Sequence, residues 1–165
     1  MDPVLVTWLE LRHPSELIPA PCHDPDFRVT RMAEPDGAVN QALYIAVGGD
    51  WAWSDKRNWD HETWQKHAEN PSLHTHVAHH GNETAGYFEL LQCGDEVEIL
   101  YFGLLPGFIG RGLGGMLLTK AIEEAWALQS QRVTVNTCSL DHPSALQNYL
   151  ARGMRIVKTA SRPPA

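Results

Sequence analysis

The sequence has 165 residues, of which 43% are apolar and 20% charged, as in an ordinary globular domain. Its net charge of −7 and pI near 5.6 argue against nucleic acids and anionic membranes as partners, because both bind basic surfaces. The three cysteines form no C-x-x-C pair, so we expect no disulfides. Neither a secretory leader nor a span of about 20 apolar residues is visible, so we expect a cytoplasmic protein.

The first half of the chain predicts two strands and two helices around an aromatic segment. Four prolines between positions 14 and 25 indicate a long irregular connection after the first strand. Gly48-Gly49 should end the first helix, and Asp60 should cap the second. The expected elements are a strand at 4–11, a short strand at 27–32, a helix at 38–47, the aromatic segment at 51–59 and a helix from Asp60 to about 69.

The second half is more regular and predicts alternating strands and helices. The expected elements are strands at 74–79 and 84–91 joined by a turn at 80–82, a long strand at 96–105, a helix at 114–128, a strand at 132–138, a helix opened by Asp141-His142-Pro143 and ended by Gly153, and a strand at 154–158. This order predicts one α/β domain over residues 1–160, with a mixed central sheet flanked by helices. Residues 161–165 should form a flexible tail.

The turn after the long strand is rich in glycine, with five glycines in the nine residues 107–115. Glycines at the start of a helix leave backbone N–H groups uncovered at the positive end of the helix dipole, where a phosphate can bind. We therefore predict a pyrophosphate site, with a tight turn that holds no ligand as the structural alternative. Gly110, Gly112 and Gly115 also spell G-x-G-x-x-G, which would suit a nucleotide-dependent oxidoreductase. That pattern requires an acidic residue about 20 positions further on, where residues 135–137 are Val-Asn-Thr.

Three segments in this half resemble the GNAT N-acetyltransferase family. Residues 109–114 (IGRGLG) resemble its acetyl-CoA loop, 97–106 (VEILYFGLLP) its long strand, and 145–154 (ALQNYLARGM) its A-x-x-x-Y-x-x-x-G helix and closing strand. The likeness covers residues 84–158 and implies a GNAT-like sheet with a splayed parallel pair of strands and acetyl-CoA as co-substrate. The cofactor-binding positions that it implies are Phe102, Gly103, Leu104, Ile109, Gly110, Arg111, Gly112, Leu113, Gly114, Gly115 and His142.

Two of these positions depart from the family pattern. Ile109 stands where the family usually has Gln or Arg, so its side chain cannot donate to a phosphate, although Arg111 could supply charge. His142 stands where the family often has an Asn that contacts the pantetheine arm. The departure at Ile109 leaves open a non-catalytic acyl-CoA-binding or regulatory domain as an alternative to the enzyme.

The resemblance also implies two catalytic residues for direct attack of an amine on the thioester. Glu98, on the long strand, matches the general-base glutamate of some family members and would act directly or through water; a solvated strand carboxylate is the alternative. Tyr149 matches the tyrosine that protonates the leaving thiolate; a core tyrosine between helix and sheet is the alternative.

The acceptor is expected to be a small-molecule amine or a peptide, bound by a monomer or homodimer. Four of the six tryptophans fall between positions 51 and 64, close to several aspartates. Aromatic faces and carboxylates both attract an ammonium group. We therefore predict that Trp51, Trp53 and Asp55 bind the acceptor together with Asn136, and we keep a hydrophobic cap over the sheet as the alternative for the tryptophans.

The histidines at 74, 76, 79 and 80 are the other cluster that could suggest a site. No carboxylate or cysteine stands at ligand spacing to complete a metal site with them. We therefore expect no metal.

Overall fold

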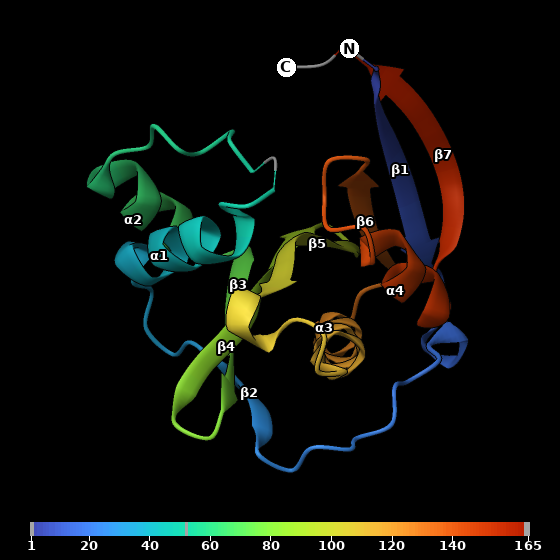
Figure 1. The fold of residues 1–165 in the computed structure, drawn as a ribbon, viewed down its shortest axis with the longest axis horizontal. Helices are drawn as coiled ribbons and strands as arrows, with labels where there is room; N and C mark the ends of the chain where they lie inside the picture. The colour runs from blue at the N-terminus through green and yellow to red at the C-terminus, as the bar shows by residue number, and fades with distance from the viewer. Residues whose placement is uncertain (1, 52, 164–165) are drawn as a thin grey trace.

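The computed structural model, which describes residues 2–51 and 53–163, contains a seven-stranded sheet with helices on both faces (Figure 1). The strands are β1 (Val4–Leu11), β2 (Phe27–Arg31), β3 (Leu73–His80), β4 (Glu83–Cys93), β5 (Glu96–Leu104), β6 (Arg132–Cys138) and β7 (Arg155–Arg162). Their order is β2-β3-β4-β5-β6-β1-β7, and every neighbouring pair is antiparallel except β5–β6. The predicted mixed sheet is confirmed, and the dinucleotide alternative fails because that fold requires a mostly parallel sheet.

Four α-helices flank the sheet. They are α1 (Gly37–Gly48), α2 (His61–Glu69), α3 (Leu113–Ala127) and α4 (Ala145–Ala151), with short 3-10 turns at Pro14–Glu16 and Pro106–Phe108. Aspartates cap the first two: Asp36 accepts a hydrogen bond from the backbone N–H of Ala38, and Asp60 accepts one from that of Thr63. The predicted capping role of Asp60 is confirmed, because its carboxylate satisfies a backbone donor that the helix leaves free.

Alternation along the central strands divides the apolar residues between two cores. On β4, Phe88 faces α3 and joins its residues Leu117, Leu118 and Ile122. Tyr87, its neighbour, faces the opposite side and packs with Leu43 of α1. Successive side chains point to opposite faces of a strand, so one buried strand supports helices on both sides of the sheet.

The two central strands β5 and β6 stay together for only a short distance. Their parallel pairing joins Glu96, Val97 and Glu98 to Arg132, Val133 and Thr134, and no pairing between these two strands is described beyond Glu98. Both strands nevertheless continue, to Leu104 and to Cys138. The sheet therefore opens into a V past Glu98, and this opening creates the space for a site.

Two elements differ from the sequence-based expectation. β7 runs to Arg162, which lies opposite Val4 of β1. The prediction of a flexible tail from residue 161 is therefore wrong for residues 161 and 162, and residues 164–165 lie outside the described part of the chain. α4 begins at Ala145 rather than at Pro143, because Asp141 turns back to accept hydrogen bonds from the Thr137 hydroxyl and the Cys138 N–H.

Candidate functional site

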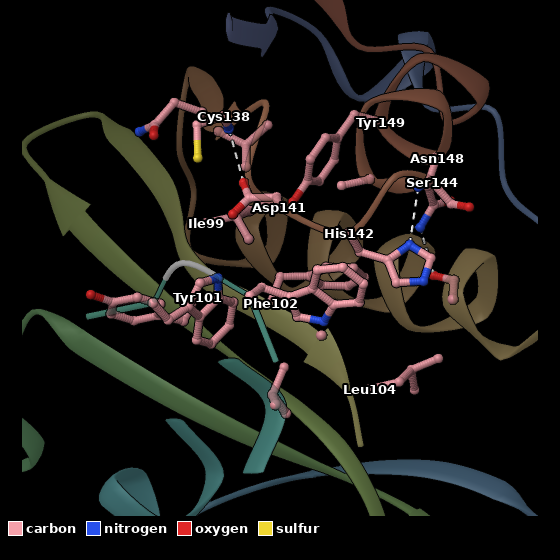
Figure 2. Close-up of a pocket in the computed structure, with 18 of the residues that line it drawn as sticks. Ile99, Tyr101, Phe102, Leu104, Cys138, Asp141, His142, Ser144, Asn148 and Tyr149 are labelled. Atoms are coloured by element: carbon pink, nitrogen blue, oxygen red, sulfur yellow. Dashed lines mark hydrogen bonds between the residues drawn. The ribbon is translucent and has the colours of Figure 1, made fainter. Parts of the chain in front are cut away.

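A cavity of about 720 Å³ lies where β5 and β6 diverge. That volume is in the range of sites that hold drug-sized ligands. Residues from β5, β6, α3, α4 and the aromatic segment after α1 line it, and Figure 2 shows part of this lining. The opening between two strands thus brings distant parts of the chain to one place.

The glycine turn forms one wall of the cavity. Gly110 and Gly112 line it with left-handed backbones, at φ 81° and 76°, which glycine adopts without strain. Gly112 precedes the first turn of α3, and no side chain of the described residues caps that turn. A Cβ added at Gly110 would meet no atom within 4 Å among the described residues, so space remains beside the backbone. An uncapped helix N-terminus beside open space suits a pyrophosphate group.

Two of the expected cofactor residues direct their side chains away from this wall. Leu113 is fully buried in a small cluster with Ala85, Phe108 and Met116. The guanidinium of Arg111 lies 5.0 Å from the centre of the Phe108 ring. Neither residue lines the cavity. Leu113 is buried because it begins the apolar face of α3, and Arg111 is held by a cation–π contact.

The remaining cofactor positions do line the cavity: Phe102, Gly103, Leu104, Ile109, Gly110, Gly112, Gly114, Gly115 and His142. His142 accepts a hydrogen bond at Nδ1 from the N–H of Ser144, at 3.0 Å, and its ring meets the edge of Trp51 at a centroid distance of 4.9 Å. The amide of Asn148 donates to the carbonyl of Gly114, at 3.0 Å, and so ties α4 to the first turn of α3.

Tyr149 enters the cavity from α4 and is only 6% exposed. Figure 2 shows its ring directed toward Asp141 and Phe102, and its centroid lies 6.1 Å from that of Phe102. Burial, followed by the negative charge of Asp141, raises the pKa of Tyr149 well above its usual value. The phenol therefore remains protonated near neutral pH and can donate a hydrogen bond into the cavity.

Glu98 lines the cavity at the apex of the V, as the last residue of β5 that pairs with β6. Burial raises the pKa of its carboxyl, and the nearby charge of Lys56 offsets part of that effect. By contrast, Glu96 pairs with Arg132 at 2.8 Å and is absent from the residues that line the cavity. The two strand carboxylates therefore differ in depth: Glu98 lies in the site and Glu96 at its margin.

The aromatic segment both lines the cavity and packs as a cap. Trp51, Trp53 and Asp55 all contribute to the lining. Trp53 also packs against Tyr44 and Tyr101, with centroids 5.6 and 5.0 Å apart. The two hypotheses for this segment are therefore compatible, because one tryptophan can present one face to the cavity and another to the core.

Asn136 also lines the cavity, as an exposed residue of β6, and Cys138 follows on the same strand. The lining residues that the sequence analysis did not assign to the site include Lys56, Tyr101, Asp141, Asn148 and Arg162. The sequence could have indicated Tyr101 and Asp141. Tyr101 lies on the strand that leads into the glycine turn, and Asp141 follows the strand that comes after the glycine-turn helix. Arg162 had none, because β7 reaches the site only by pairing with β1.

Comparison with solved structures supports the same fold. A GCN5-related N-acetyltransferase from Sphaerobacter thermophilus is similar with a TM-score of 0.74 at 13% identity, over 98% of this chain and 51% of that one. A GCN5-related N-acetyltransferase from Kribbella flavida gives a TM-score of 0.66 at 15% identity, over 98% and 59%. This chain thus spans little more than half of those proteins.

A third similar structure is close to this chain in length. It is an aminoglycoside acetyltransferase from an uncultured soil metagenomic sample, with a TM-score of 0.60 at 20% identity over 78% of this chain and 88% of that one. At such identities, all three structures establish the fold alone. No curated protein is significantly similar to this chain in sequence. In the described residues no helix is long and apolar enough to cross a membrane.

A family model provides the remaining evidence. The model of the acetyltransferase (GNAT) family matches residues 39–154, which include the aromatic segment, the V of the sheet, the glycine turn and Tyr149. The chain belongs to the acetyltransferase (GNAT) family.

Proposed function

We propose that this protein transfers the acetyl group of acetyl-CoA to a primary amine, by direct attack of the amine on the thioester. The observation that carries the proposal is that Glu98 and Tyr149 line the same cavity as the uncapped N-terminus of α3. A carboxylate, a phenol and an anion site in one cavity supply the three roles that the reaction requires.

The glycine turn would hold the pyrophosphate of acetyl-CoA through backbone amides, with Gly110 leaving room for it. When bound, acetyl-CoA supplies an activated acetyl group as a thioester. Asn148 keeps the first turn of α3 in place through its bond to the Gly114 carbonyl. Amides of this kind can replace the donor that Ile109 lacks, so binding of acyl-CoA does not require a donor side chain at this position.

Glu98 would take the proton that the ammonium group must lose before its nitrogen can attack. Burial raises the pKa of this carboxyl, which moves it closer to the working pH and makes it a better base than a solvated carboxylate. The nitrogen then forms its bond to the acetyl carbon, the carbon–sulfur bond breaks, and the nitrogen loses a second proton, which replaces the one that Tyr149 gives to the sulfur.

Tyr149 would donate its phenol proton toward the departing sulfur. Its hydroxyl is protonated near neutral pH because burial and Asp141 raise its pKa. A backbone N–H among Phe102, Gly103 and Leu104, which pair with β4 but lie beyond the pairing of β5 with β6, is the candidate for stabilising the developing oxyanion.

The test is release of free CoA thiol when the protein is mixed with acetyl-CoA and a panel of primary amines. Thiol release that requires the amine, with the acetylated amine detected by mass spectrometry, supports the proposal. Binding of acetyl-CoA without turnover of any amine would favour the regulatory alternative suggested by Ile109.

A further inference from the structure

Lys56 is a partly buried lysine at the end of the cavity lined by Trp51, Trp53 and Asp55, which we call the acceptor end. Its side chain is 13% exposed and lines the cavity beside Asp55. The ammonium lies 3.1 Å from Asp55 Oδ2, donates to the Tyr101 hydroxyl, and is 4.9 and 4.6 Å from the ring centres of Trp59 and Tyr101. Lysines are rarely buried to this degree unless they are paired, and this one has a carboxylate and two aromatic faces.

The carboxylate that holds Lys56 is itself fixed by two tyrosines. Asp55 Oδ1 accepts from the Tyr44 hydroxyl at 2.7 Å, and Oδ2 accepts from the Tyr101 hydroxyl at 2.8 Å. Burial acts to raise the pKa of Asp55, but the bonds from Tyr44, Tyr101 and Lys56 together lower it. The Asp55 side chain is still 63% exposed, so a ligand can approach it. Aromatic rings around an ionised carboxylate form a site for an ammonium group, and Lys56 occupies it.

Two other carboxyls line the cavity, Glu98 at the apex of the V and Asp141. Asp141 already accepts hydrogen bonds from the Thr137 hydroxyl and the Cys138 N–H, which leaves Glu98 as the carboxyl for the reacting amine. Lys56 and Arg162 are the lysine and the arginine among the described residues of the lining. A second ammonium on a substrate could approach the exposed side of Asp55, but it would meet the charge of Lys56 there instead of an unpaired carboxylate.

We propose that Lys56 is a specificity-determining residue, which fills the second cation site and restricts the acceptor to amines with one positive charge on an apolar body. This inference rests on the proposed function, because it concerns the same acetyl transfer. The selection works by repulsion: the internal ammonium excludes diamines and polyamines that the aromatic rings and Asp55 would otherwise attract.

The test compares two matched pairs of acceptors, hexylamine with hexamethylenediamine and benzylamine with para-xylylenediamine. In the wild type, kcat/KM for each monoamine should exceed that for its diamine by about tenfold or more. Lys56→Met keeps the length of the side chain and removes its charge, so the diamine-to-monoamine ratio should rise by about tenfold, mainly through a lower KM for the diamine. Lys56→Arg keeps the charge and should keep the wild-type ratio.

A double variant covers the case in which the unpaired Asp55 destabilises Lys56→Met. Asp55→Asn combined with Lys56→Met removes both charges of the ion pair. It should lose part of the discrimination against diamines, because neither the repelling ammonium nor an attracting carboxylate remains, so its ratio should lie between those of the wild type and Lys56→Met. Calorimetric titration of the same amines, with CoA present, gives Kd ratios that need no turnover and should follow the same order.

The outcomes separate this inference from the proposed function. Suppose that amines are acetylated but the diamine-to-monoamine ratio is the same in wild type and Lys56→Met. The proposed role of Lys56 is then wrong and the proposed function stands; if Lys56→Met does not fold, the double variant is compared with wild type in its place. If no amine is acetylated while the Kd ratios shift as expected, the function fails and the role of Lys56 stands. Absence of both turnover and amine binding in the wild type overturns both.

Discussion

Gly114→Ala should weaken acetyl-CoA binding while leaving the fold intact or slightly more stable. Gly114 is the second residue of α3 and lines the cavity. The nearest atoms to an added Cβ are Asn148 Nδ2 at 3.6 Å and Leu104 Cδ1 at 4.0 Å, which are ordinary contacts. Replacing glycine by alanine in a helix stabilises it by up to about 1 kcal/mol, or about 2–4 °C in a domain of this size.

The expected loss of affinity can be measured as a thermal shift. Acetyl-CoA at about 100 times its Kd should stabilise the wild type by about 2.7 kcal/mol, or roughly 5–10 °C. If the methyl group weakens binding about tenfold, the same concentration stabilises the variant by only about 1.4 kcal/mol. Differential scanning calorimetry with and without acetyl-CoA should therefore show a higher Tm for the free variant and a shift about half as large on binding.

Gly107→Ala is the matched control from the same turn. Gly107 does not line the cavity, and a Cβ there would meet no atom within 4 Å of the described residues. It should keep the full ligand-induced shift. Gly112 is a poorer test, because its left-handed backbone and the His23 ring 2.8 Å from an added Cβ would perturb the fold. A full shift in Gly114→Ala would show that the first turn of α3 does not face the cofactor.

Three further substitutions test the catalytic and acceptor roles. Tyr149→Phe should lower kcat by about 10–100-fold with little change in the KM for acetyl-CoA, because only a donor to the transition state is lost; unchanged kcat would assign Tyr149 to the core. Glu98→Gln should lower kcat on the order of 10²-fold. Burial raises the pKa of Glu98 above that of the unfolded chain, so the folded state loses stability as pH rises through that raised pKa. Glu98→Gln should therefore raise Tm at neutral pH and lose this gain in acid. A gain in Tm that does not change with pH would contradict the raised pKa of Glu98. Trp53→Leu should raise the KM for the amine several-fold and lower Tm, while the KM for acetyl-CoA stays constant; a lower Tm with an unchanged amine KM would leave Trp53 as a cap only.

Local patterns in the sequence determined most of the order of strands and helices. Alternation and helical spacing report which face of a segment is buried, and this property belongs to the segment itself. The strand at 4–11 and the strand at 132–138 were therefore predicted with the observed bounds. The glycine turn, Glu98 and Tyr149 were recognised as site candidates because they stand at the spacings of a known family. Glu98, Tyr149 and four glycines of the turn line the cavity.

The sequence does not predict where a strand or helix ends when that end depends on a distant part of the chain. β7 continues to Arg162 because β1 lies beside it, and neither segment signals the other in the sequence. α4 begins late because Asp141 bonds back to the end of β6. Arg111 and Leu113 stand in the glycine turn, but packing around Phe108 directs both side chains away from the cavity.

Only the tertiary structure decided what occupies the aromatic end of the site. The sequence places Trp51, Trp53 and Asp55 together, and all three line the cavity. It does not show that Tyr101 of β5 completes this group, or that Lys56 fills it with the protein's own charge. The composition of a segment indicates which ligands it can attract. Which group of the protein reaches the aromatic segment depends on how β5 packs against the segment after α1.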